Sequence, residues 1–366
     1  MAADPLFEPF ELNGLSLDNR VGLAPMTRTS ATEDGHPTDR MARYYRSFAR
    51  GGFSFLVTEG TYTDETHSQG YPGQPGLATD AQAEAWQPVV EAVHEEERPI
   101  FAQLMHAGAQ AQHEARTAGT VAPSAYQPPG EMAEVYGGSG KFPEAEALDA
   151  EGLAAVKSSF VDAATRALDA GFDGIEVHAA NGYLLHEFLD PLVNERTDQY
   201  GGTPENRARF PAEVVAAIDE ATPDKFVVGV RVSQGAVTDE DRTWPDERAT
   251  ARAVFEALTE AGAGYLHVTE PAIAEPAFGS EGPTLTQLAA DHGDTVVIAN
   301  GGIGTPEKAR GALAAGADLL TQATAALANH DWPKRVREGQ ELDDLDPSVI
   351  FQPDASISDA EIPSDD

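Results

Sequence analysis

The chain has 366 residues, 41% of them hydrophobic, and a formal net charge of -37 that arises from 61 acidic and 24 basic residues. Nucleic acids and anionic membranes are bound by clustered lysine and arginine, so this charge excludes both as partners. The chain contains no cysteine, which excludes disulfides, thiolate nucleophiles and cysteine-ligated iron–sulfur clusters. Any redox chemistry therefore requires a bound organic cofactor.

The distribution of charge also indicates a compartment. Lysine is scarce and the acidic residues are spread along the whole chain, which favours a halophilic cytoplasm whose salt screens the repulsion. An ordinary acidic protein is the alternative. The sequence contains no apolar run of eighteen residues and no secretion signal, so we expect a cytoplasmic protein.

Short apolar runs alternate with amphipathic stretches from one end of the chain to the other. In chain order, the predicted strands are 20–24, 53–58, 100–104, 174–177, 226–232, 265–268, 296–299 and 318–321. The clearest predicted helices are 81–94, 152–170, 204–221, 246–261 and 306–315. This alternation predicts an α/β fold, a (β/α)₈ TIM barrel; a doubly wound sheet is the alternative, but no GxGxxG motif follows the first strand.

The chain is expected to form one barrel domain, 1–342, followed by an acidic tail, 343–366. The aperiodic Gly/Pro-rich segment 118–143 is predicted to be a long excursion after the third strand, over the mouth of the active site. The last dozen residues of the tail are expected to be disordered.

Polar residues at the carboxyl ends of barrel strands are the first candidates for a site. After the seventh strand, Asn300-Gly301-Gly302 leads into a helix, which suits phosphate binding, although a functionless tight turn fits equally well. Arg231 and Gln103 lie within apolar strands. Arg231 suits an anionic or acceptor-rich ligand and Gln103 the edge of an amide-like ring. A structural salt bridge and a satisfied core glutamine are the alternatives.

The fourth strand ends in "HAANGY". His178 and Asn181 could together hold a carbonyl oxygen and stabilise negative charge that develops on it. Tyr183 could supply a proton. No HExxH motif occurs, so no metal site is predicted.

Taken together, these motifs resemble the Old Yellow Enzyme family of flavin-dependent ene-reductases. The resemblance rests on "LFEPFELNGLSLDNRVGLAPMTR" (6–28), "GYPGQPG" (70–76), "QLMHAG" (103–108), "HAANGYLLHEFLDPLVNERTDQYGG" (178–202), "VRVS" (230–233), "NGGIGTPEKA" (300–309) and "ALANHDWPKRV" (326–336). These pieces occur in order between residues 5 and 339, and the block after His178 is the most specific.

The resemblance implies a barrel that binds FMN without a covalent link. The residues implied in cofactor binding are Ala24, Pro25, Met26, Thr27, Gly60, Gln103, Arg231, Asn300, Gly301, Gly302, Ala323 and Thr324. His178 and Asn181 would bind the substrate carbonyl, and Tyr183 would protonate Cα. NAD(P)H as co-substrate and small-molecule enones or enals would alternate in one pocket, in a ping-pong reduction of the C=C bond through flavin N5.

The sequence departs from the family pattern at several positions. Ala323 and Thr324 stand where many members carry Gly-Arg against the FMN phosphate, and Ala109 replaces an arginine at the expected rim of the pocket. Thr27 replaces the cysteine of one subgroup. A homo-oligomer is left open. A non-redox phosphate-binding barrel enzyme and a catalytically silent flavin-binding protein are the alternative functions.

Overall fold

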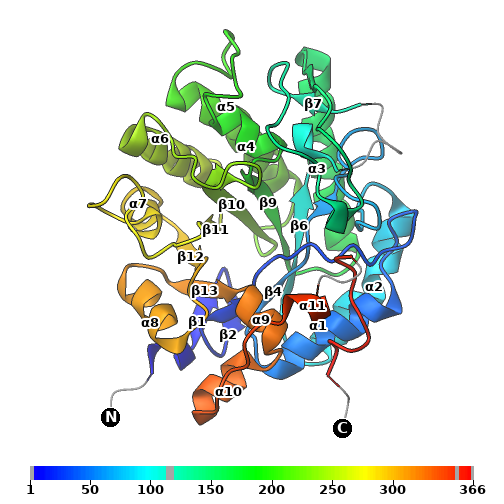
Figure 1. Cartoon of the computed structure of the whole chain (residues 1–366), viewed down its shortest axis with the longest axis vertical. Helices are drawn as coiled ribbons and strands as arrows, with labels where there is room; N and C mark the ends of the chain where they lie inside the picture. Colours follow the sequence, from blue (N-terminus) through cyan, green and yellow to red (C-terminus); the bar gives the residue numbers. More distant parts are fainter. Residues whose placement is uncertain (1–3, 113–118, 351–353, 364–366) are drawn as a thin grey trace.

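The structure is a computed structural model that describes residues 4–112, 119–350 and 354–363. Its centre is a closed barrel of parallel strands surrounded by helices (Figure 1). The barrel strands are β3 (Val21–Leu23), β4 (Leu56–Val57), β6 (Ile100–Met105), β9 (Gly174–Asn181), β10 (Val227–Ala236), β11 (Tyr265–Thr269), β12 (Val296–Asn300) and β13 (Leu319–Gln322). β4 pairs with β6 and β13 pairs with β3, which closes the ring. The predicted (β/α)₈ barrel and its eight strands are confirmed.

A helical layer covers the outside of the barrel. Its helices are α1 (Asp39–Gly51), α2 (Asp80–His94), α3 (Ala150–Asp169), α4 (Leu184–Leu189), α5 (Pro204–Ala221), α6 (Glu247–Glu260), α7 (Leu285–His292), α8 (Pro306–Ala314), α9 (Thr324–Ala328) and α10 (Trp332–Glu338). The shorter elements are η1 (Pro5–Phe7), β5 (Thr61–Tyr62), η2 (Gly108–Gln110), β7 (Val121–Ala122), η3 (Glu134–Tyr136), β8 (Glu146–Ala147) and α11 (Pro347–Ile350). Within the described ranges, no helix is both long and apolar enough to traverse a bilayer.

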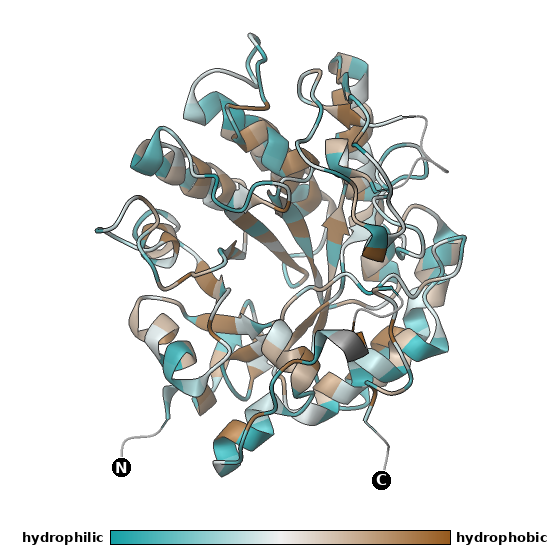
Figure 2. Ribbon diagram, viewed as in Figure 1, coloured by the Kyte–Doolittle hydropathy of each residue, from teal (hydrophilic) through white to brown (hydrophobic). Residues whose placement is uncertain are grey.

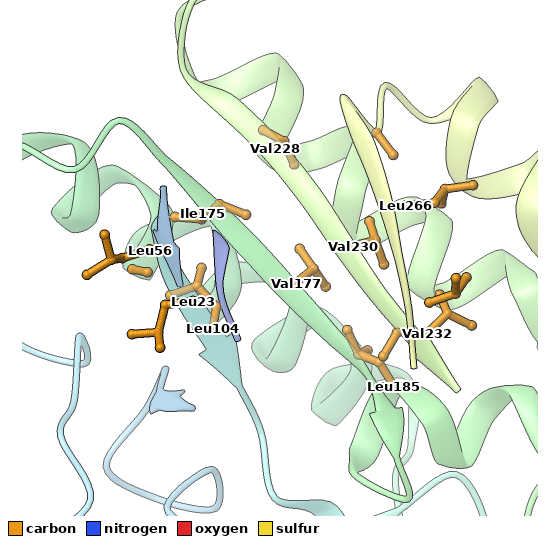
Figure 3. Packing of buried hydrophobic residues seen from close by; sticks show 14 of the residues in the cluster. Leu23, Leu56, Leu104, Ile175, Val177, Leu185, Val228, Val230, Val232 and Leu266 are labelled. Atoms are coloured by element: carbon orange, nitrogen blue, oxygen red, sulfur yellow. The ribbon is translucent and has the colours of Figure 1, made fainter. Parts of the chain in front are cut away.

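The barrel strands are buried on both faces, and side chains still alternate between them. On β10, Val228, Val230 and Val232 belong to the core shared with the helices, whereas Val227 belongs to the core inside the barrel. Figure 3 shows these outward valines beside Ile175 and Val177 of β9. Successive strand residues point to opposite faces, so Arg231 must point into the barrel. The brown central strands of Figure 2 show why alternation of hydrophobicity alone does not reveal this.

A hairpin of β1 (Phe10–Leu12) and β2 (Leu15–Leu17) belongs to the core at the amino-terminal end of the barrel. Its turn, Asn13-Gly14, has positive φ at both residues, 47° and 85°, as a tight hairpin turn requires. Leu12 and Leu17 are buried against Phe55, Val57, Phe101, Val227, Tyr265, Ile298 and Leu319. The opposite end of the barrel, where the strands end, is the side on which the polar residues gather.

The C-terminal region differs from the expectation of disorder over the last dozen residues. Residues 354–363, here called the tail segment, pack against the barrel, and Ala355 and Ile357 are fully buried. Glu361 forms a two-pronged ion pair with Arg28, with N–O distances of 2.8 and 2.9 Å, and both side chains are only 1% exposed. The described part of the tail is therefore ordered by a buried charge pair, which compensates for its polar composition.

Candidate active site

β9 brings the three predicted substrate residues to one strand end. The His178 ring lies edge-on to the Tyr183 ring, with 4.9 Å between ring centres. Burial, and then the charge of Arg231, lower the pKa of His178 well below its ordinary value. The Nδ1 atom accepts the Ala180 N–H at 3.3 Å, so a neutral His178 carries its proton on Nε2. Asn181 has a left-handed backbone (φ 63°), donates its N–H to Ser233, and lines the cavity described below.

A second tyrosine, Tyr71, contacts Tyr183 and is a site residue that was not predicted from the sequence. The Tyr71 and Tyr183 hydroxyls are hydrogen-bonded, and the Thr27 hydroxyl also bonds Tyr71. Burial raises the pKa of Tyr183 to about 12, so its proton is retained at neutral pH. Tyr136 of η3 packs on Tyr71, with 5.0 Å between ring centres. Tyr136 belongs to the excursion 118–143, which therefore reaches the site, as expected. Tyr71 could have been found from the sequence, because it lies in the motif "GYPGQPG".

Arg231 is the buried cation of the site. Its Nη2 donates to Asn300 Oδ1 at 2.8 Å and to Thr269 Oγ1 at 3.2 Å, which ties β10 to β11 and β12. Its Nε is buried and has no hydrogen-bond partner among the described residues. A structural salt bridge was the alternative role for Arg231, but among the described residues Arg231 forms no ion pair with the barrel carboxylates Glu176 and Glu59. An unused buried N–H calls for an acceptor that a ligand would supply.

Gln103 lies on β6, two strands from Arg231 in the barrel, opposite Glu176 in the β6–β9 register. Its Nε2 donates to Glu176 Oε1 at 2.8 Å, and Glu176 also accepts from Tyr265 and contacts His267. The amide group is therefore held in one orientation, and its Oε1 can accept a ring N–H. Gly60 lies beside it, because a Cβ on Gly60 would fall 3.5 Å from Gln103 Oε1.

The segment after β3, residues 24–27, contains four more of the residues predicted to bind the cofactor. Ala24 and Pro25 are buried, and Met26 and Thr27 are half-buried. The Ala24 N–H donates to the carbonyl of Gln322 on the other side of the β3–β13 junction. Ala109, expected at the rim, is instead fully buried and donates its N–H to Glu187.

A cavity of about 460 Å³ lies at the other end of the site. Asn300, Gly301, Gly302, Ala323 and Thr324 line it, so the structure brings together the residues predicted for phosphate binding. Gly301 has φ 114°, and a Cβ there would lie 1.7 Å from the Glu270 carbonyl oxygen. The glycine is therefore required for the loop to pack against the segment after β11.

The predicted residues thus form two adjoining parts. Asn181 and the glycine loop line the open cavity, whereas His178, Tyr183, Gln103 and Arg231 are buried beside it, and Arg231 bridges to Asn300. The ring part fits an isoalloxazine: Arg231 Nε offers a donor, Gln103 an acceptor and Thr27 a hydroxyl. The cavity has room for a ribityl phosphate, but no lysine or arginine of the described residues lines it.

Comparison with known proteins gives a consistent result. Residues 5–343 match the model of the NADH:flavin oxidoreductase / NADH oxidase family. The chain is 33% identical to 12-oxophytodienoate reductase 2 of Arabidopsis thaliana, over 98% of this chain and 96% of that one. It is 31% identical to a probable flavin mononucleotide-dependent alkene reductase of Leishmania infantum, over 95% and 94%. The Old Yellow Enzyme homologue of Zymomonas mobilis superimposes with a TM-score of 0.85 at 30% identity, covering 98% of both chains.

Proposed function

Because the chain belongs to the NADH:flavin oxidoreductase / NADH oxidase family and is an NAD(P)H-dependent flavin oxidoreductase with FMN as its cofactor, we propose that it reduces the C=C bond of α,β-unsaturated aldehydes and ketones. The observation that carries this proposal is the buried Tyr183 hydroxyl beside the His178 ring, where burial raises the pKa of Tyr183 and lowers that of His178. FMN, when bound, supplies hydride transfer between NAD(P)H and the substrate.

Substrate binding is the role of the residues at the end of β9. The His178 Nε2–H and the Asn181 side-chain amide would donate to the carbonyl oxygen of the substrate and stabilise the charge that develops on it. A neutral histidine suits this role, because it donates one hydrogen bond without bringing a full charge into a buried site. The carbonyl is thereby fixed so that its α carbon lies toward Tyr183.

Proton delivery is the role of Tyr183. Its hydroxyl holds a proton at neutral pH, and the Tyr71 hydroxyl remains hydrogen-bonded to the oxygen as that proton is transferred to Cα. Arg231 would bind the flavin ring. Its Nε–H would donate to an acceptor on the ring, and its positive charge would favour the reduced state of the flavin. NAD(P)H and the enone would use the same place in turn, which makes the reaction ping-pong.

The test separates the two half-reactions under anaerobic conditions. FMN-loaded protein is reduced by NADPH, and its reoxidation by cyclohexenone is followed by flavin absorbance. We expect Tyr183→Phe to slow reoxidation by about 10²–10⁴-fold, the usual contribution of a general acid, and to leave reduction nearly unchanged. Tyr136→Phe, in the same aromatic cluster, is the control and should change neither rate.

Other outcomes would identify another function. Equal slowing of both half-reactions would contradict the proton-donor role of Tyr183. A flavin that binds but is not reduced by NADPH would indicate a catalytically silent flavoprotein. A colourless protein that takes up no FMN would indicate a non-redox barrel enzyme.

A further inference from the structure

The phosphate end of the cavity has an unusual charge balance for an anion site. Its lining includes two carboxylates, Glu240 and Glu270, and the other lining residues are uncharged. The groups that suit a phosphate are the main-chain N–H groups of the glycine loop, at the start of α8, and the Thr324 hydroxyl. The N–H groups of the loop therefore attract a dianionic phosphate, whereas the two carboxylates repel it when they are ionised.

Glu270 is the carboxylate built into this site. It follows β11 directly, and its Oε1 accepts the Gln234 N–H at 2.8 Å. Its backbone packs on the glycine loop, since the Glu270 carbonyl oxygen is the atom that a Cβ on Gly301 would meet. Burial raises the pKa of Glu270 to about 7, so its charge changes near neutral pH.

No basic side chain among the described residues lines the cavity to offset the charge of Glu270. Glu240, on the loop after β10, is exposed and of the same sign. Arg231 of β10 does not itself line the cavity; its Nη2 donates to Thr269 and Asn300, which do. The loops after β12 and β13 contribute only uncharged residues to the cavity lining. Among these groups, ionisation of Glu270 is therefore the change that most directly opposes a phosphate.

We propose that Glu270 determines how strongly the chain binds the phosphate of its flavin: the loop amides and Thr324 hold the phosphate when Glu270 is protonated, and the ionised carboxylate weakens that contact. This inference rests on the proposed function. It predicts that affinity for FMN falls as pH rises through neutrality. Affinity for riboflavin, which lacks the phosphate, does not fall.

The test measures flavin binding, not turnover. The full chain is freed of flavin and titrated with FMN and with riboflavin at pH 6.0 and 8.5, at constant ionic strength, by quenching of flavin fluorescence. The ratio of the two Kd values isolates the phosphate contact. For the unmodified chain, we expect the preference for FMN over riboflavin to be at least about tenfold smaller at pH 8.5 than at pH 6.0, because the added negative charge at the cavity repels the phosphate.

Variants assign the effect. Glu270→Gln keeps the acceptor for Gln234 and should remove most of the pH dependence; what remains is the titration of the phosphate itself, whose second pKa is about 6. Glu240→Gln, an exposed carboxylate at the same cavity, is the matched control and should change the ratio less than about threefold. Thr324→Arg should increase affinity for FMN about tenfold or more without changing that for riboflavin.

Two negative results are distinguishable. If both flavins bind and the FMN-to-riboflavin ratio has the same pH dependence in the unmodified chain and in Glu270→Gln, the role of Glu270 is refuted while the proposed function stands. If neither flavin binds at any pH, the proposed function itself fails.

Discussion

The Arg28–Glu361 pair allows a quantitative test of how the tail segment is held. We consider Glu361→Gln, which keeps the size of the side chain and one acceptor oxygen but removes its charge. Arg28 would then be a buried cation whose remaining partners are the carbonyl oxygens of Ala355, Ile350 and Ser356 and the Tyr44 hydroxyl.

The expected loss follows from the burial of both side chains. Removing one partner of a buried ion pair costs about 3–5 kcal/mol, because the other charge stays desolvated. Three carbonyl oxygens still accept from the guanidinium, so we expect the lower end, about 3 kcal/mol of unfolding free energy. Surface pairs contribute only about 0–1 kcal/mol, and the tail segment also contains one: Asp359, whose side chain is 68% exposed, contacts Arg43 at 3.0 Å.

The assay is urea unfolding at fixed salt concentration, compared between Glu361→Gln and Asp359→Asn. The buried substitution should lower the unfolding free energy by about 3 kcal/mol and the exposed one by less than about 1 kcal/mol. If the two variants lose the same free energy, the buried charge pair is not what holds the tail segment.

Three further predictions concern the site. Gly301→Ala places a methyl group 1.7 Å from the Glu270 carbonyl oxygen, at a residue with φ 114°, so the variant should lose its flavin on gel filtration. Gly311 has open space around it, so the control variant Gly311→Ala should retain flavin. His178→Ala should weaken binding of a phenolic ligand about tenfold, the value of one hydrogen bond, as measured by its charge-transfer absorbance; unchanged affinity would count against carbonyl recognition there. Because the pKa of Tyr183 is raised to about 12, its acid form persists below that pH, and the reoxidation rate should be flat from about pH 6 to 9.5; a loss with a midpoint near pH 8 would contradict this protonation state.

The barrel could be predicted from the sequence because each of its strands and helices leaves a pattern within a short stretch of residues. Each strand is a short apolar run, and helix starts such as Thr203-Pro204 and Thr305-Pro306 consist of a capping threonine followed by a proline in the first turn. The hairpin of β1 and β2 was missed even though Asn13-Gly14 is a strong turn signal, because its strands have only three residues each. Polar residues at strand ends were found for the same local reason.

The remaining features depend on contacts between distant residues. Arg28 and Glu361 are 333 positions apart, so composition alone suggested disorder where the fold supplies a partner. The Tyr71–Tyr183 contact joins two different loops, and sequence order gives no sign that the two hydroxyls meet. The position of Glu270 beside the glycine loop depends likewise on the packing of β11 against β12.

The junction of β3 with β13 has a consequence for how the enzyme is made. Residues 21–23 pair with residues 320–322, and Arg20 donates to the Asp318 carbonyl across 298 positions. A ribosome that adds about 5–20 residues per second needs roughly 15 to 60 s to synthesise that interval. Until then the ring is open, and Thr27 and Thr324 belong to separate, unpaired parts of the chain. The complete cofactor site can therefore form only after nearly the whole chain has been synthesised.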